Sequence, residues 1–317
     1  MAEIGTDISR AAHFLKSSVI GIPTETVYGL AGNALDVDRV TQIFDVKNRP
    51  VFDPLIVHVS SLEAAYDLVL DFPEKLKLLA TTFWPGPLTL LLDKREIIPD
   101  LVTSGLQRVA LRVPAHPLTL NLLKSIQFPL AAPSANPFGY ISPTTAQHVN
   151  EQLGERIPYI LNGGPSRVGI ESTIVGIENN QPVIYRLGGL PAEEIEKITG
   201  ECIIKQGSSN PAAPGMLDSH YAPRKPLLFG DINQLIEKAN NKSVLILGFG
   251  DFQINIPDSK VFNLSKSANL SEAAANLFKM MRLADAEPEE LIIAQKLPET
   301  GLGRAINDRL RRASSNI

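Results

Sequence analysis

Residues 22–30 read Ile-Pro-Thr-Glu-Thr-Val-Tyr-Gly-Leu, and residues 47–58 read Lys-Asn-Arg-Pro-Val-Phe-Asp-Pro-Leu-Ile-Val-His. The chain between them predicts a helix that follows Asp36, a good N-cap, and ends before Pro50. Its buried face, at the i, i+3, i+4, i+7 spacing, would hold Val40, Ile43, Phe44 and Lys47. Hydroxyl groups, a Lys/Arg pair and a histidine therefore gather within two strand–helix units. We expect the rest of the chain to complete a pocket around them.

Composition and charge limit the class of protein. The 317 residues are enough for two domains, and 44% hydrophobic and 20% charged residues are typical of a soluble globular protein. A net charge of −4 and a pI of about 5.8 argue against extended binding to nucleic acid, which favours a basic excess. A small basic pocket inside an acidic protein is compatible with both values.

The sequence also predicts a location. The first residues include Glu3 and Asp7 and no apolar run, unlike a signal peptide. Nowhere do about eighteen apolar residues follow one another, so no transmembrane helix and no membrane partner are expected. Cys202 is the single cysteine, which excludes an internal disulfide and is typical of a reducing compartment. We therefore expect a cytoplasmic protein.

Two predicted strands carry polar side chains on one face. In residues 55–59, Ile56 and His58 lie opposite the face formed by the leucine and the two valines. Residues 108–113 alternate in the same way and place Arg108 and Arg112 on one face. Two arginines on a strand face need an anion, or carboxylates, opposite them.

A rigid polar loop, Pro133-Ser-Ala-Asn-Pro137, follows a predicted strand at 128–132. Ligands of open α/β sheets commonly bind at such strand ends. Ser134 and Asn136 are equally well explained as ordinary turn residues. Shortly after, Ser142-Pro143 has the signature of a helix start, an N-cap followed by proline at the first helical position.

The individual signals have ordinary explanations. Lys47 and Arg49 alone would be a solvated helix end favoured by the helix dipole, and His58 could be a core histidine. Together with the arginines of the later strand, however, several cations converge. Their repulsion would cost several kcal/mol at an effective dielectric constant of about 20 unless a polyanion binds, and a triphosphate is the obvious candidate.

The sequence lacks the signatures of other known sites. The five histidines and one cysteine show no zinc-site spacing, so no protein-held metal is expected. There is no P-loop and no nucleophile elbow. Gly248-Phe-Gly250 lacks the rest of a dinucleotide fingerprint. If ATP binds, a different kind of loop must bind it.

The sequence divides into two parts. Residues 207–215 read Gly-Ser-Ser-Asn-Pro-Ala-Ala-Pro-Gly, which is linker composition. Beyond them, strands near 243–248, 261–264 and 291–294 and a helix near 271–284 predict a separate α/β unit. The predicted division is a catalytic domain at 1–205, a linker at 206–225 and a C-terminal α/β domain at 226–317.

Six motifs, in order, carry a resemblance: Pro-Thr-Glu-Thr-Val-Tyr-Gly-Leu at 23–30, Lys47-x-Arg49-Pro, Asp53-Pro-Leu-Ile-Val-His58, Ala132-Pro-Ser-Ala-Asn136, Glu171-Ser-Thr-Ile-Val175 and Arg186-x-Gly188. Together they resemble the YrdC family. The segment Pro214-Gly-Met-x-x-x-His220-Tyr221-Ala-Pro223 and the second α/β unit are similar to its longer members, the two-domain threonylcarbamoyl-adenylate synthases.

The resemblance implies a fold and a reaction. The fold would be a twisted, open mixed α/β sheet of the YrdC (DHBP synthase-like) type around a concave positive cavity, with a smaller Rossmann-like C-terminal domain. The enzyme would be a nucleotidyltransferase that converts L-threonine, bicarbonate and ATP, accompanied by Mg²⁺, into threonylcarbamoyl-AMP and pyrophosphate. A tRNA threonylcarbamoyl transferase complex would then modify the adenosine 3′ of the anticodon.

The resemblance also implies residue roles. L-threonine would be held by Thr26, His58, Arg112, the backbone of Ala132, and Ser172, with Arg112 as a bidentate fork for the carboxylate. ATP would be held by Lys47, Arg49, Asp53, Arg108, Ser134, Ser142, Arg186 and Tyr221. The reacting groups would lie beside Lys47, Arg49, Ser134 and Asn136.

Some of these assignments stay open at this point. Asp53 stands where many family members carry asparagine, and a carboxylate near phosphates would repel them unless it faces a cation. The hydroxyl of Thr24 lies in the same loop as that of Thr26. Tyr221 would close over the nucleotide from the linker and exclude water from a labile intermediate.

Two other functions compete with the synthase. A concave positive surface could make the protein a double-stranded RNA-binding module, although the acidic pI and the lack of a basic stripe interleaved with aromatic residues argue against it. The carbamoyl-transfer domain of hydrogenase maturation proteins shares the YrdC core. Those chains are longer and carry zinc-type cysteine clusters, which this sequence lacks.

Overall fold

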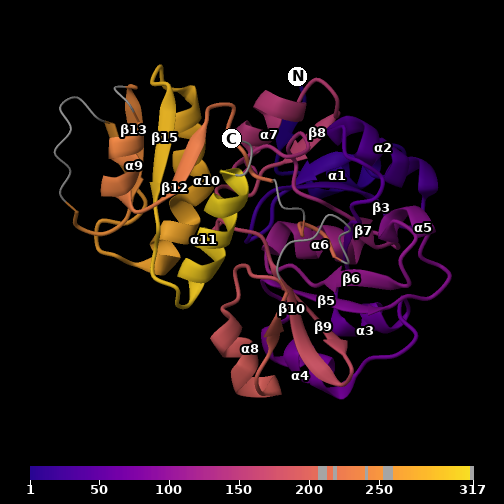
Figure 1. Cartoon of the computed structure of the whole chain (residues 1–317). Helices are drawn as coiled ribbons and strands as arrows, with labels where there is room; N and C mark the ends of the chain where they lie inside the picture. Colours follow the sequence, from indigo (N-terminus) through magenta and orange to yellow (C-terminus); the bar gives the residue numbers. More distant parts are fainter. Residues whose placement is uncertain (206–212, 217–219, 240–241, 253–259, 315–317) are drawn as a thin grey trace.

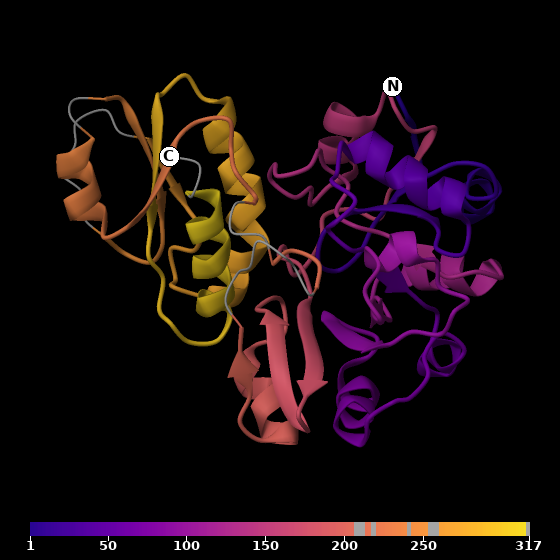
Figure 2. The same cartoon turned by 45° about the vertical axis from the view of Figure 1, so that its right-hand side comes forward.

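The computed structural model describes residues 1–205, 213–216, 220–239, 242–252 and 260–314. These residues form two sheets with their covering helices, which lie side by side as two bodies (Figure 1). The turned view in Figure 2 shows the same two bodies. The two-domain α/β architecture predicted from the sequence is confirmed.

The larger sheet has eleven strands in the order β1-β8-β2-β3-β7-β4-β6-β5-β9-β10-β11. It is mixed, because β4 pairs parallel to β6 whereas β5 pairs antiparallel to β6. The strands are β1 Glu3–Gly5, β2 Ile20–Ile22, β3 Gly29–Asn33, β4 Ile56–His58, β5 Leu88–Asp93, β6 Arg108–Arg112, β7 Leu130–Ala131, β8 Tyr159–Leu161, β9 Thr173–Glu178, β10 Gln181–Arg186 and β11 Ile203–Ile204.

The alternation predicted for the central strands is confirmed. Val57 of β4 and Leu111 of β6 belong to the main core, together with residues of the covering helices, whereas Ile56 and Ala110 pack on the opposite face. The helices of this domain are α1 Ile8–Phe14, α2 Val37–Lys47, α3 Leu62–Tyr66, α4 Glu74–Phe83, α5 Asp100–Thr103, α6 Pro117–Ser125, α7 Ala146–Leu153 and α8 Ala192–Thr199.

Helix α2 forms as its sequence predicts. The Asp36 carboxylate accepts hydrogen bonds from the backbone N–H groups of the first turn. The helix ends at Lys47, and Asn48 caps it in the left-handed conformation with φ of 51°. Lys47 lies on the buried side together with Val40, Ile43 and Phe44. A cationic side chain is thereby directed into the protein.

The predicted helix start at Ser142-Pro143 is wrong. Helix α7 begins at Ala146, and Thr145 is its N-cap, accepting a hydrogen bond from His148 N at 3.2 Å. The carbonyl of Pro143 instead accepts from Tyr28 N at 2.9 Å, and the carbonyl of Thr144 accepts from a residue of another loop. These two carbonyls accept hydrogen bonds from distant segments, so they are not available to the backbone N–H groups of a helix. The first helical turn therefore begins after them.

The second sheet is parallel, with strand order β12-β15-β13-β14. Its elements are β12 Leu227–Gly230, α9 Ile232–Lys238, β13 Val244–Gly248, β14 Lys260–Asn263, α10 Leu270–Ala286, β15 Leu291–Gln295 and α11 Leu302–Ala313. Helix α9 covers one face, while α10 and α11 cover the other, on the side of the larger domain (Figure 1). Within the described part of the chain, none of the helices combines the length and apolarity that a membrane span needs.

The two domains share an apolar and polar interface. Val27, Ile141 and Ile170 of the first domain pack into the core formed by α10 and α11. Arg282 of α10 donates hydrogen bonds to the carbonyls of Ile141 and Ser142 and to Gln152 Oε1, the last at 3.0 Å. The exact domain boundaries stay a prediction, and residues 206–212 and 217–219 of the proposed linker lie outside the described residues.

Replacing Arg282 with methionine should lower the free energy of unfolding by about 1–3 kcal/mol, because acceptors of the first domain lose a charged donor. Urea denaturation monitored by circular dichroism measures this change. Lys279→Met, on the exposed side of the same helix, is the matched control and should change the value by less than about 0.5 kcal/mol. Equal effects of the two substitutions would contradict the proposed interface role.

Candidate active site

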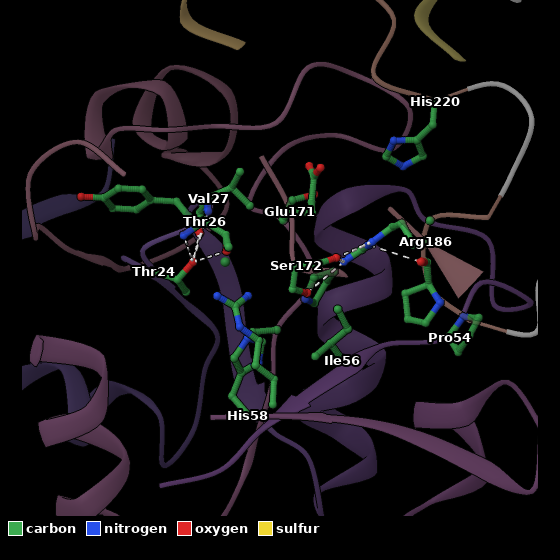
Figure 3. Close-up of a pocket in the computed structure, with 18 of the residues that line it drawn as sticks. Thr24, Thr26, Val27, Pro54, Ile56, His58, Glu171, Ser172, Arg186 and His220 are labelled. Atoms are coloured by element: carbon green, nitrogen blue, oxygen red, sulfur yellow. Dashed lines mark hydrogen bonds between the residues drawn. The ribbon is translucent and has the colours of Figure 1, made fainter. Parts of the chain in front are cut away.

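One pocket brings together most of the side chains singled out in the sequence. It lies on the face of the larger sheet opposite the main core, and the segment before β12 contributes part of its wall (Figure 3). The pocket is lined by Thr24, Thr26, Val27, Tyr28, Gly29, Arg49, Pro54, Ile56, His58, Arg112, Ala132, Pro133, Ser134, Glu171, Ser172, Arg186, Pro214, Gly215, His220 and Tyr221.

The loop between β2 and β3 presents Thr26 to the pocket. Thr24 Oγ1 donates to the carbonyl of Val27 at 2.6 Å and accepts from the backbone N–H groups of Thr26 and Val27. The two threonine hydroxyls are 2.8 Å apart. Either hydroxyl can be the donor in that pair. Thr24 therefore holds the loop in shape, and the loop places Thr26 in the pocket lining.

Arg112 is oriented by a carboxylate that the sequence analysis did not single out. Its Nη2 donates to Glu25 Oε1 at 2.6 Å, and its Nε donates to the carbonyl of Gly86 at 3.1 Å. Glu25 is fixed in turn, because its other oxygen accepts from Ala115 N. Both members of the pair are buried. The edge of the guanidinium formed by Nε and Nη2 is thus used by the protein, and Nη1 makes no hydrogen bond to the described part of the chain.

His58 reaches the pocket from β4 (Figure 3). Burial, followed by the charge of Arg112, lowers the pKa of His58 to about 3. The ring is therefore neutral near pH 7. Its Nδ1 is buried and has no hydrogen-bond partner among the described residues. A neutral ring with an unused nitrogen is suited to binding a polar ligand rather than to attracting an anion.

Arg49 and Asp53 form a buried pair at the end of α2. Arg49 Nη2 lies 2.8 Å from Asp53 Oδ2, and the same guanidinium donates to the carbonyls of Asp53 and Pro54. Asp53 does not line the pocket. It is fully buried and faces a cation, as a carboxylate near phosphates would need to. Burial raises the pKa of Asp53, and the charge of Arg49 opposes this rise.

Lys47 and Asn136 also lie outside the pocket lining and support its polar loop. Lys47 Nζ donates to the carbonyl of Ser134 at 2.6 Å and to the carbonyl of Asn136. The Asn136 amide donates to the carbonyls of Pro137 and Tyr140. Burial, followed by the charge of Arg49, lowers the pKa of Lys47 well below its usual value. Through its two hydrogen bonds, Lys47 holds the loop that presents Ser134.

The opposite wall is built around Arg186. Its Nε and Nη2 donate to the carbonyl of Ser172 at 3.0 and 2.9 Å, and its Nη1 donates to the carbonyl of Pro214. Ser172 Oγ accepts a further bond from Nη2 at 3.1 Å. A side chain at Gly188 would collide with the backbone here, since its Cβ would lie 2.3 Å from the carbonyl oxygen of Glu171. This close approach explains the glycine in the Arg-x-Gly motif.

Ser142 and Arg108 occupy different places from the lining residues. Ser142 Oγ donates to Glu171 Oε1 at 2.5 Å and lies behind that carboxylate. Arg108, at the far end of β6, donates to Tyr185 Oη at 2.8 Å and lies 3.7 Å from Glu178. The sequence predicts that the two strand arginines need an anion or carboxylates opposite them, and in the structure each has a carboxylate nearby, Glu178 at 3.7 Å for Arg108 and Glu25 at 2.6 Å for Arg112. The pocket nevertheless contains only Arg112 of the two.

Tyr221 closes one side of the pocket. It is buried, with φ of 67°, and its ring stacks on Phe278 of α10 at 5.6 Å between centroids. The guanidinium of Arg309 lies 5.1 Å from the centre of the same ring. Neither α11 nor Arg309 was predicted from the sequence. Arg309 has no local motif that would have identified it, whereas Glu25 lies inside the motif at 23–30 and only its partner could not be read from the sequence.

Comparisons with known proteins agree with this arrangement. A family model described as telomere recombination, covering Sua5, YciO and YrdC proteins, matches residues 13–188. A second model, described as the C-terminal domain of threonylcarbamoyl-AMP synthase, matches residues 190–315.

Curated relatives match along nearly the whole chain. The threonylcarbamoyl-AMP synthase of Pyrococcus abyssi is 41% identical, over 96% of this chain and 93% of its own. That of Bacillus subtilis is 39% identical, over 97% and 92%. The crystal structure of P. abyssi Sua5 complexed with L-threonine superposes with a TM-score of 0.90, covering 97% of this chain and 94% of that one. The chain therefore belongs to the Sua5/YciO/YrdC family, in the two-domain form of the threonylcarbamoyl-AMP synthases.

Proposed function

We propose that the protein is an L-threonylcarbamoyladenylate synthase, which converts L-threonine, bicarbonate and ATP into threonylcarbamoyl-AMP and pyrophosphate. The observation that carries this proposal is a single pocket in which a small polar subsite adjoins two further arginines. The subsite contains Thr26, His58 and Arg112, and the further arginines are Arg49 and Arg186. The likeness to curated synthases over both domains supports the same reaction.

In this proposal L-threonine binds in the small polar subsite. The free Nη1 of Arg112 would bind the carboxylate, and Thr26 and His58 would bind the polar groups on the other side of the ligand. Ser172 and the backbone of Ala132 would complete the subsite. Because Glu25 already binds Nη2, the protein fixes the orientation of the guanidinium before the ligand arrives.

ATP would bind on the adjoining side, where Arg49, Ser134 and Arg186 line the pocket and Tyr221 closes it. The threonine amine would react with bicarbonate to give a carbamate and water. A carbamate oxygen would then attack the α-phosphorus, and pyrophosphate would leave. The arginines would stabilise the negative charge that develops on the phosphates, and burial strengthens this effect.

Three residues that the resemblance places at ATP or the reacting groups have indirect roles in this proposal. Lys47 and Asn136 would act through the loop that carries Ser134, since Lys47 donates to two of its carbonyls. Asp53 would hold Arg49 in place rather than contact the nucleotide. Contacts of Ser142 and Arg108 with ATP stay predictions, and a variant of Arg108 below examines the second.

The carboxylates at the site are already paired with arginines, which affects how Mg²⁺ could be held. Asp53 is paired with Arg49, and Glu171 is paired with Arg309. Among the described residues, no group of three or more His, Cys, Asp or Glu side chains is arranged to hold a metal ion. We therefore propose that Mg²⁺ enters with ATP and is held by phosphate oxygens and water, as is usual for this ion.

A second enzyme would use the product, threonylcarbamoyl-AMP. We propose that a tRNA threonylcarbamoyl transferase complex in the cytoplasm receives it, because a mixed carbamoyl–phosphate anhydride is labile in water. The alternative of an RNA-binding module makes an opposite prediction, namely salt-dependent binding of duplex RNA without any need for threonine.

Release of pyrophosphate by the purified protein tests the proposed function. With ATP and Mg²⁺ present, release should require both L-threonine and bicarbonate, because the carbamate is the attacking nucleophile. A coupled pyrophosphate assay with each substrate omitted in turn measures this requirement. Release that continues without threonine would sink the proposal, and tight RNA binding without any release would favour the binding module.

Arg112→Lys should raise the KM for L-threonine by about 10- to 100-fold and leave the KM for ATP within about threefold of the wild-type value. The ammonium keeps the charge but loses the planar fork that Glu25 and Gly86 orient. Arg108→Lys, on the same strand face but outside the pocket, should not change the KM for threonine. An increase in its KM for ATP would support the contact implied for Arg108.

A double substitution of Arg49 and Asp53 should distinguish an effect on catalysis from an effect on folding. The double substitution Arg49→Met with Asp53→Asn leaves no buried carboxylate without its partner, so the thermal midpoint should stay close to that of the wild type. Its kcat should fall by at least about 100-fold, because a cation beside the phosphates is lost. A near-normal rate in this folded variant would refute the role given to Arg49.

A further inference from the structure

A buried arginine of the C-terminal domain reaches the wall of the pocket. Arg309, on α11, has an exposed fraction of 0%, and its Nε donates to Glu171 Oε2 at 2.8 Å. Helix α11 lies on the side of its sheet that faces the larger domain (Figure 1). The two partners are 138 residues apart in the sequence.

Glu171 is held by donors on both of its oxygens. Ser142 Oγ donates to Oε1 at 2.5 Å, while Arg309 occupies Oε2. In Figure 3 the carboxylate lies above Ser172, toward His220 and away from His58. Burial raises the pKa of Glu171, but the charges of Arg309 and Arg186 and the bond from Ser142 outweigh it and lower the pKa below its usual value. The Glu171 carboxylate is therefore negatively charged, although it lies in the wall of a pocket proposed to bind the negatively charged triphosphate.

Arg309 is itself held rigidly by its surroundings. Its Nη1 donates to Asp308 Oδ2 at 2.9 Å, and Asp308 Oδ2 also accepts from Arg312 Nε at 3.0 Å. The guanidinium lies over the ring of Tyr221, which lines the pocket. An arginine fixed by its own helix and by an aromatic ring can set the position of the carboxylate that it binds.

The second cation near Glu171 is Arg186, whose charge also lowers the pKa of Glu171. Arg186 binds the carbonyl of Ser172, the residue that follows Glu171. Without Arg309, Glu171 would be a buried carboxylate whose strongest remaining counter-charge is Arg186. The carboxylate would then compete with phosphate oxygens for that guanidinium.

We infer that Arg309 is a positioning residue of the synthase: it holds Glu171 away from Arg186, so that Arg186 stays available to the triphosphate of ATP. This inference rests on the proposed function for the identity of the anion. It gives the C-terminal domain a direct part in nucleotide binding, through one ion pair between the domains.

The test compares four proteins: the wild type, Arg309→Met, the double variant Arg309→Met with Glu171→Gln, and the control Arg311→Met. Arg311 lies on the same helix with its side chain 61% exposed. Calorimetry gives the Kd of ATP and of L-threonine, and the pyrophosphate assay gives kcat. Arg309→Met should weaken ATP binding by about 10- to 100-fold and threonine binding by less than about threefold.

The double variant should recover at least about tenfold of the lost ATP affinity, because a neutral amide neither needs the counter-charge nor competes for Arg186. If Arg309→Met does not fold, Arg309→Lys replaces it and should give a smaller loss of the same kind, since its charge remains. Arg311→Met should bind both ligands as the wild type does.

Each failure has a different meaning. Equal weakening of both ligands, or no recovery in the double variant, would mean that Arg309 only joins the domains, and the inference would be overturned. A wild type that binds ATP but releases no pyrophosphate with threonine and bicarbonate would overturn the proposed function instead. The binding constants would then still decide the role of Arg309.

Discussion

The pocket depends on one constraint, which is that three arginines buried within it must be neutralised while no ligand is bound. Two of them face a carboxylate directly. These pairs are Arg112 with Glu25 and Arg49 with Asp53. Arg186 instead donates to the carbonyls of Ser172 and Pro214, and the carboxylate whose charge acts on it, Glu171, is paired with Arg309. Glu25 and Asp53 do not line the pocket, whereas Glu171 does. A charged ligand can then bind the remaining donors without displacing the partner that orients each arginine.

This arrangement explains why the binding groups come from so much of the chain. Loops after β2 and α2 supply Thr26 and Arg49, the ends of β6 and β10 supply Arg112 and Arg186, and α11 supplies Arg309. The apolar contacts between Val27, Ile141 and the helices of the second domain bring α11 to the site. Folding of the second domain and completion of the pocket are therefore physically coupled.

Local patterns were sufficient for much of the fold and the site. The apolar spacing and the cap at Asp36 correctly predicted α2 and the buried Lys47, and alternation correctly predicted which face of β4 carries His58. The start of α7 could not be predicted, because Pro143 uses its carbonyl to bind a residue more than one hundred positions earlier. Arg309 could not be predicted either, since its partner Glu171 is brought to it only by the packing of two domains.

A crystal structure of the protein with L-threonine and a non-hydrolysable ATP analogue would test the central claim most directly. The account predicts the threonine carboxylate at Nη1 of Arg112, with Glu25 still bound to Nη2, and the triphosphate between Arg49 and Arg186 under Tyr221. A triphosphate bound outside this pocket, or a threonine carboxylate that displaces Glu25 from Arg112, would contradict it.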